Sequence, residues 1–308
     1  LTASGGSGDT NYRVSANLRE IEGILNNTGY DQLNTRASLN TKALNDKLTL
    51  NFNLSYTKRD SDLGDERAFE FAQFYNPTAP IYGSDSPFIF NSPQYGGYFE
   101  QLGLFRSYNP VSIIEQTRNT RNSTDFNYNI SAILELAESL NITFRAAEQK
   151  TTSRSQLYRP TTLLFEGNAV SPTRRGLANH NAYDLSTSVY ELFGAWDKSF
   201  KSVDLVFTAG YSYNQINSEG TGFGLGDFPD NSLDYSDAIQ NSQDLLNEGY
   251  VSANSYASPD EKIIAFFGRL NLTFNNNIFF NASLRREGST KLGADNKWGL
   301  FPSVGAGA

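Results

Sequence analysis

The sequence predicts an all-β fold, a portion of an antiparallel transmembrane β-barrel with short turns at one end and long loops at the other. Two observations predict this class: strand-like segments in which apolar and polar residues alternate, and connections that alternate between short and long. In the clearest strand Leu48, Leu50 and Phe52 share one face, while Asn51 and Asn53 share the other. The first face suits lipid and the second suits water.

Further strands follow the same pattern along the chain. We expect strands at residues 10–21, 31–41, 47–58, 126–134, 140–146, 185–196, 203–213, 266–274 and 280–285, and a tenth from about residue 298. Short helices are expected at 65–74, capped by Asp65, and at 110–117, with a proline in the first turn.

The connections fall into two classes. Short links are expected at 44–46, 135–139, 197–202 and 275–277, long ones at 59–122, 152–182 and 214–260, and intermediate ones at 22–30 and 288–296. Outer-membrane barrels have short periplasmic turns and long extracellular loops, whereas a soluble sandwich has no reason to sort its loops. Aromatic residues near the strand ends fit interfacial girdles: Tyr56, Trp196, Tyr211, Tyr213 and Trp298.

Composition narrows the alternatives. The 308 residues include 17 Tyr and 22 Phe, an aromatic content that argues against a disordered chain. No apolar run is long enough for a transmembrane helix. The net charge of −8 argues against a nucleic-acid partner, and the absence of cysteine excludes disulfides. We interpret residues 1–308 as part of a single barrel domain, an interior segment of a longer protein.

No pattern of catalytic residues is apparent, so we do not expect an enzyme. His180 is the sole histidine, has no triad or zinc-site spacing around it, and is expected in a loop. The glycine-rich run 222–226 lacks the lysine of a phosphate loop and is expected to be an exposed flexible loop. No cofactor is expected. Loop-bound calcium is the one alternative, at either of two acidic groups: Asp60, Asp62, Asp65 and Glu66, or Asp227, Asp230, Asp234 and Asp237.

The first long connection is rich in aromatic residues. They could pack the loop against itself, meet a partner protein, or stack on substrate such as sugar rings. The residues selected as a partner- or substrate-facing loop are Phe90, Tyr95, Tyr98, Phe99, Phe105 and Tyr108.

The carboxyl-terminal segment carries a specific motif, whose residues are Arg285, Gly288, Ser289, Trp298, Gly299, Phe301 and Pro302. Pro302 within the motif predicts a strand start, an edge or a bulge. The motif resembles a stretch of the SusC/RagA class of TonB-dependent outer-membrane transporters, in which an Arg–acidic–Gly–Ser hairpin loop precedes a Trp-Gly-Leu-Phe-Pro-Ser strand. Two weaker echoes of that class occur in the first long connection, at 76–82 and 109–112.

The resemblance implies a larger barrel of roughly twenty-two strands with a plugged lumen, of which this chain supplies about ten. It also implies residence in the bacterial outer membrane, in contact with lipid and lipopolysaccharide. The implied activity is TonB-dependent import of oligosaccharides or peptides together with a SusD-like surface lipoprotein, as a possible dimer of barrel–lipoprotein pairs. The plug and the TonB-contacting segment would lie outside this chain. A barrel serving attachment or assembly, and a soluble all-β binding module, are the alternatives.

Overall fold

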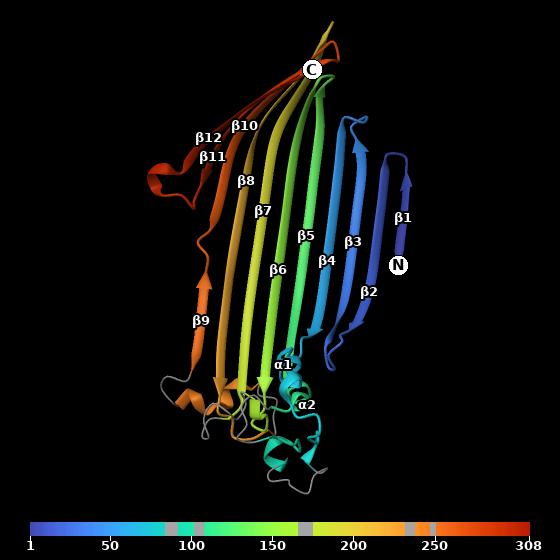
Figure 1. Ribbon diagram of the computed structural model, residues 1–308. Helices are drawn as coiled ribbons and strands as arrows, with labels where there is room; N and C mark the ends of the chain where they lie inside the picture. The colour runs from blue at the N-terminus through green and yellow to red at the C-terminus, as the bar shows by residue number, and fades with distance from the viewer. Residues whose placement is uncertain (84–91, 102–107, 166–174, 232–237, 247–250) are drawn as a thin grey trace.

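The computed structural model describes residues 1–83, 92–101, 108–165, 175–231, 238–246 and 251–308. Its main element is one twelve-stranded sheet in which strands adjacent in sequence pair antiparallel; β9 pairs with β8 beside the path that continues to β10 (Figure 1). The strands are β1 (Thr2–Ser7), β2 (Thr10–Glu22), β3 (Gly29–Ala43), β4 (Leu48–Asp62), β5 (Arg118–Ala137), β6 (Leu140–Arg159), β7 (Leu177–Phe200), β8 (Val203–Gly226), β9 (Ser252–Ala257), β10 (Glu261–Phe274), β11 (Ile278–Ser289) and β12 (Trp298–Gly307). This up-and-down sheet confirms the predicted all-β barrel portion.

Two short α-helices lie at the end of the sheet where the long connections gather (Figure 1). They are α1 (Arg67–Phe74) and α2 (Pro110–Gln116), with 3₁₀ turns at η2 (Ser92–Tyr95), η4 (Ile239–Asn241), η5 (Gln243–Leu246) and η6 (Ala294–Asn296). Both helices were expected. The predicted N-cap of α1, Asp65, is wrong by one residue, because Glu66 is the N-cap. Asp65 Oδ1 instead accepts a hydrogen bond from the Arg67 backbone N–H. Within the described parts of the chain, no helix is both long and apolar enough to cross a membrane.

The cross-strand register divides the sheet into an apolar face and a polar face. Residues opposite one another in an antiparallel pair share a face. The pairs Leu39↔Phe52 and Leu54↔Tyr128 therefore lie on the apolar face, and Ser38↔Asn53 lies on the polar face with Asn129, the partner of Asn53 on β5. Large side chains on the apolar face stay exposed in this chain: Leu18, Phe144, Leu192, Trp196, Phe207, Phe266, Leu284 and Leu300. An uncovered apolar face of this extent requires a membrane or another protein against it.

The aromatic residues expected at the strand ends all lie on the apolar face. Tyr211, Tyr213 and Trp298 form a band across β8 to β12, with Tyr211 packed on Phe266 at 5.3 Å between ring centroids and Tyr190 near Tyr213 at 6.2 Å. Trp196 is opposite Phe207 in the register of β7 and β8. Tyrosine and tryptophan at such positions have a polar tip for the headgroup region and a ring for the acyl chains.

The strands are longer than predicted and two are new. At the loop end, β7 and β8 extend about a dozen residues beyond the part of each strand in which apolar and polar residues alternate. The strands β1 and β9 were not expected. Two predictions are therefore wrong. His180 is not in a loop but in β7, where it stacks on Phe223 of β8 at 5.3 Å; the glycine-rich run 222–226 is the end of β8, paired with β7 and β9. Backbone pairing continues there because a hydrogen-bond ladder does not require the two faces to differ in polarity.

Short turns close the other end of the sheet. Leu44, Asn45 and Asp46 all have positive φ between β3 and β4, and Asn275 and Asn276 do so between β10 and β11. Asparagine and aspartate tolerate this left-handed region, which is why these residues give tight hairpins. The predicted sorting of short turns and long connections to opposite ends is confirmed (Figure 1).

The buried core sits at the long-connection end rather than along the sheet. One cluster, which we call the loop hub, joins α1, α2 and the segment after β6; its buried members are Ala68, Phe71, Ile113, Leu163 and Phe165. A second cluster packs Phe228 and Ile239 over the tips of β6 and β7 at Tyr158 and Ala178. The hub fixes the connections at one end of the polar face.

Candidate functional site

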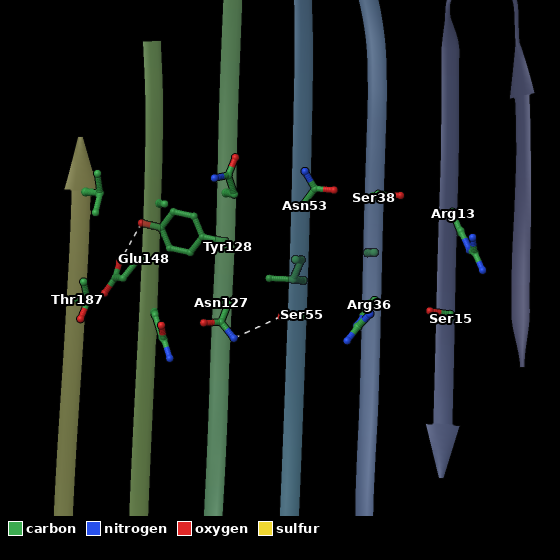
Figure 2. A pocket seen from close by; sticks show the side chains of 16 residues that line it. Arg13, Ser15, Arg36, Ser38, Asn53, Ser55, Asn127, Tyr128, Glu148 and Thr187 are labelled. Atoms are coloured by element: carbon green, nitrogen blue, oxygen red, sulfur yellow. Dashed lines mark hydrogen bonds between the residues drawn. The ribbon is translucent and has the colours of Figure 1, made fainter. Parts of the chain in front are cut away.

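A hollow with a volume of about 700 Å³ lies on the polar face of β2–β7. Figure 2 shows Arg13 and Ser15 on β2, Arg36 and Ser38 on β3, and further polar side chains on β4 to β7. Hydroxyl and amide groups lie beside the two arginines, so the hollow offers many hydrogen-bonding positions next to apolar surface from residues such as Leu54 and Val189. The remaining polar side chains labelled on this face are Asn53, Ser55, Asn127 and Thr187.

Asn53 lies on the polar face as the strand pattern predicts, and several side chains of this face pair with one another. Asn127 donates to Ser55 at 3.4 Å within the hollow (Figure 2). On later strands, Arg145 forms an ion pair with Glu191 at 3.6 Å, and Arg285 forms an ion pair with Glu287 at 2.7 Å. Asn53 and Asn129 are cross-strand partners in the hollow. On β10, Asn271 is opposite Asn281 of β11.

Asn109, the N-cap of α2, joins this helix of the loop hub to the rest of the first long connection. It is fully buried, and its amide donates to the carbonyls of Ile81 at 2.8 Å and Phe99 at 3.0 Å. Its Oδ1 accepts from the backbone of Val111 and Ser112 and so caps α2. The two weak sequence echoes therefore meet here, because Ile81 belongs to the first and Asn109 to the second.

Glu100 adds a titratable group to the hub. Its carboxylate accepts from the Asn109 backbone N–H at 3.0 Å. Burial raises the pKa of Glu100 to about 7, although the hydrogen bonds from Asn109 and Ser112 act to lower it. The carboxyl group therefore changes charge near neutral pH, next to the cap of α2.

The aromatic residues selected from the sequence are mostly used to hold this connection together. Tyr108 packs on Phe71 and Phe165 with ring centroids 5.1 Å from each. Tyr95 is buried, and Phe99 contributes its carbonyl to Asn109 and to the Tyr75 hydroxyl. These contacts match the first alternative, in which the loop packs against itself.

Tyr98 is partly exposed. It lies 5.5 Å from Tyr82, measured between ring centroids, and its hydroxyl donates to Glu115 at 2.5 Å. Phe90 and Phe105 lie outside the described residues. Sequence reasoning missed Phe69 and Phe74 on α1, which are 51% and 56% exposed and present large apolar side chains to the surroundings. The sequence signal for them was the presence of apolar residues in a short predicted helix. No second layer of apolar residues was expected to pack on that helix.

A buried ion pair joins the hub to the sheet. Asp65, just after β4, accepts from Arg159 at the end of β6 at 2.7 Å, and the two side chains are 6% and 5% exposed. Arg67 also donates to Asp65 at 2.9 Å. Burial acts to raise the pKa of Asp65, but the hydrogen bonds from Arg67 and Arg159 outweigh it and the pKa is lowered. Asp65 therefore remains ionised and acts as a structural anion.

The carboxyl-terminal motif has a structural explanation in the β11–β12 hairpin. Gly288 is opposite Trp298, and a Cβ at this glycine would come within 2.9 Å of the indole ring. The guanidinium of Arg286 lies 5.0 Å from the centre of the same ring, within cation–π range. Ser289 accepts from the Lys291 backbone N–H at 3.2 Å and closes the turn. Glycine is needed at 288 because the ring lies against the strand.

The remaining motif residues lie on β12. Gly299 pairs with Glu287 and Phe301 with Arg285, so Phe301 belongs to the polar face. Pro302 pairs with Leu284 on the apolar face, in the middle of β12 and in an unbroken register. It is therefore neither at a strand start nor at a bulge of this pair.

The acidic groups considered for calcium do not converge in the described part of the chain. No set of three potential metal-ligating side chains comes together among the described residues. Asp65 is committed to the two arginines, and Asp60 forms an ion pair with Lys58 at 3.0 Å. Asp234 and Asp237 lie outside the described residues.

Sequence comparison finds relatives over almost the whole chain. The chain is 23% identical to the TonB-dependent receptor P3 of Formosa agariphila over 98% of its length, and 23% identical to the TonB-dependent receptor SusC of Bacteroides thetaiotaomicron over its full length. It covers 29% and 30% of those proteins, so it spans less than a third of the curated relatives. No family model matches the sequence.

Comparison with solved structures shows the same fold. A structure of the RagAB peptide transporter matches 99% of this chain and 33% of that chain, with a TM-score of 0.75 at 19% identity. The pyoverdine-bound receptor FpvA of P. aeruginosa matches 99% of this chain with a TM-score of 0.54 at 14% identity. The structural matches show the fold of part of a TonB-dependent barrel. Together with the sequence relatives, they confirm the resemblance to the SusC/RagA class of TonB-dependent transporters, whose place is the bacterial outer membrane.

Proposed function

We propose that the protein containing this chain imports nutrients across the outer membrane in a TonB-dependent manner. The observation that carries the proposal is the two-faced sheet: an exposed apolar face with an aromatic band, and a polar face hollowed over β2–β7. Lipid and lipopolysaccharide meet the first face, and a hydrated solute passes along the second. Oligosaccharides and peptides are the proposed cargo, in keeping with hydroxyl and amide groups in the hollow and with relatives named for SusC and a peptide transporter.

In this proposal residues 1–308 form part of a single barrel domain. The plug and the TonB-contacting segment belong to parts of the protein outside this chain. Import is tested by deleting the full-length gene, and separately TonB, and measuring growth and uptake with oligosaccharides or peptides as the sole carbon source. Loss of uptake in both strains supports import. Uptake that persists without TonB contradicts it.

A SusD-like surface lipoprotein is the proposed partner, in pairs that assemble as dimers. Phe69 and Phe74 on α1 support a contact at the loop end, because large exposed apolar side chains are typical of interface cores. The test is co-purification of the lipoprotein with full-length protein carrying Phe69→Ser and Phe74→Ser. Leu44→Ser is the matched control, since Leu44 is 63% exposed in a short turn at the opposite end. We expect loss of the lipoprotein in the first variant alone; equal retention in both would refute the contact.

An attachment or assembly component is the second candidate function. The loop hub favours it only to the extent that it gives the connections a fixed shape suited to holding a partner. This second function predicts that deletion of the gene leaves uptake unchanged and instead removes a surface complex. The same strains would show both results.

A further inference from the structure

The charged residues of β2, β3 and β4 are sorted by face. In these three strands, all of whose residues are described, the register places five basic and no acidic side chains on the polar face: Arg13, Arg19, Arg36, Lys42 and Arg59. The acidic side chains of the same strands lie on the other face: Glu20, Glu22, Asp31, Asp60 and Asp62. A surface that only needed to be hydrated would carry both positive and negative side chains. The polar face of β2–β4, which we call the basic track, therefore has a positive potential of its own.

The chain does not neutralise the middle of the basic track. Arg13 and Arg36 are exposed, and neither forms a hydrogen bond or an ion pair with any residue that the structure describes. They extend from neighbouring strands, since Arg36 is opposite Ser15 and Arg13 is opposite Ser38 (Figure 2). Farther along the face, by contrast, Arg145 and Arg285 each have a carboxylate partner. The two unpaired guanidinium groups are available to a ligand.

The surroundings of Arg13 and Arg36 suit an anionic group on a polar scaffold. Both line the hollow of about 700 Å³ on β2–β7. Guanidinium groups form bidentate hydrogen bonds with carboxylate, sulfate and phosphate oxygens. The neighbouring Ser38 and Asn53 offer neutral donors and acceptors to the rest of the solute.

The basic track continues toward the loop end through an aromatic stack. The guanidinium of Arg59 lies 4.7 Å from the centre of the Tyr30 ring, and that of Arg19 lies 5.7 Å from it. Gln32 accepts from Arg59 at 2.7 Å and fixes it without cancelling its charge. Tyr30 is the second residue of β3, so this second pair of cations lies nearer the loop end of the sheet than Arg13 does. A series of like charges along a confined wall raises the local concentration of oppositely charged solutes.

We propose that the basic track binds anionic groups of the imported solute, carboxylate, sulfate or phosphate. Arg19 and Arg59 receive them near the loop end, and Arg13 and Arg36 hold them in the hollow. The inference rests on the proposed import function and adds the charge class of its cargo. An acidic segment elsewhere in the full-length protein is the competing occupant.

The test uses full-length protein extracted with its partners from outer membranes in detergent. The probes are a heparin hexasaccharide, which carries carboxylate and sulfate groups, and the neutral maltohexaose, measured by isothermal titration calorimetry. We expect the wild type to bind the anionic probe at least tenfold more tightly than the neutral one. The variant Arg13→Gln/Arg36→Gln should lose most of that difference, and raised salt should weaken the wild type more than the variant.

Lys58→Gln is the matched control, because it removes one cation from the same strands on the opposite face. It should leave the affinity for heparin hexasaccharide unchanged. Equal affinity of wild type and double variant would overturn the proposal, as would equal loss in the control. No binding by the wild type would also overturn it and favour the acidic segment as occupant. Unchanged heat-modified gel migration shows that each variant has folded.

The outcome separates this inference from the proposed function. If uptake requires TonB but the double variant binds the anionic probe as the wild type does, import stands and the anionic cargo falls. If probe binding depends on Arg13 and Arg36 but uptake does not require TonB, the anion site stands and the import function falls.

Discussion

The ion pair between Asp65 and Arg159 should control whether the loop hub stays closed. Replacing Asp65 by Asn leaves the Arg159 guanidinium buried, 5% exposed, without its carboxylate at 2.7 Å. Removing one partner of a buried pair costs about 3–5 kcal/mol, because the remaining charge loses the carboxylate that faced it but stays out of water. At about 1.4 kcal/mol per factor of ten, the opening equilibrium of the hub should rise by roughly a hundredfold to several thousandfold.

Amide hydrogen exchange of the detergent-solubilised full-length protein measures this opening. The reporters are the Tyr75 and Thr117 backbone N–H groups, which close α1 and α2 by donating to Phe71 and Ile113. We expect faster exchange at both in Asp65→Asn and near wild-type exchange at the turn amide of Asn277, at the other end of the sheet.

A double variant separates charge from packing. In Asp65→Leu/Arg159→Met the pair is replaced by apolar side chains, which is often close to neutral for stability. Protection should therefore return toward the wild-type level. Exchange in Asp65→Asn that matches the wild type would refute the reasoning, and a double variant as open as the single one would show that volume rather than charge holds the hub.

Three further predictions concern the hairpin, the apolar face and pH. Gly288→Val should destabilise the β11–β12 hairpin by about 1–3 kcal/mol, since its side chain would overlap the Trp298 ring, and Trp298→Ala should rescue it; the readout is the urea midpoint of refolding into vesicles. Leu192→Arg on the apolar face should cost about 2–4 kcal/mol in the same assay, whereas Val189→Arg on the polar face should cost far less; equal costs would mean that the faces are assigned wrongly. The folded-state pKa of Glu100, about 7, lies above its ordinary 4.5, so its contribution to hub stability is full below pH 4.5 and is lost as pH rises through 7. Amide hydrogen exchange in the hub, corrected for intrinsic rates, should therefore become faster over this pH window. The variant Glu100→Gln should abolish this change.

The existence of the strands was predictable, but their ends were not. Inside the apolar band the two faces differ in polarity, so alternation marks a strand such as the middle of β4. Beyond it, β8 carries Gln215 and Asn217 on one face and Ser218 and Gly220 on the other, and the contrast disappears. The ladder of backbone hydrogen bonds continues regardless. Sequence periodicity therefore measures the lipid-facing part of a strand rather than its whole length.

The loop hub shows a second limit of the sequence. A proline preceded by asparagine predicts a capped helix at α2, because capping depends on residues a few positions apart. The Asp65–Arg159 pair joins residues 94 positions apart, and nothing local to either one marks the other. The aromatic residues of the connection were recognised as a group, but their use in packing depended on Phe165, which lies after a different strand.

The basic track adds a distinction that alternation alone does not make. A strand pattern separates polar from apolar positions, and Asn53 and Arg36 count equally as polar in it. The sign of the charge acquires meaning only when β2, β3 and β4 are laid side by side, because Arg13 and Arg36 then become neighbours on one face while Asp31 and Asp60 become neighbours on the other. Membrane insertion constrains the apolar face strictly and leaves the sign of charge on the polar face free. A consistent sign on that face therefore reflects what the lumen holds, and that is the physical basis for assigning the cargo a negative charge.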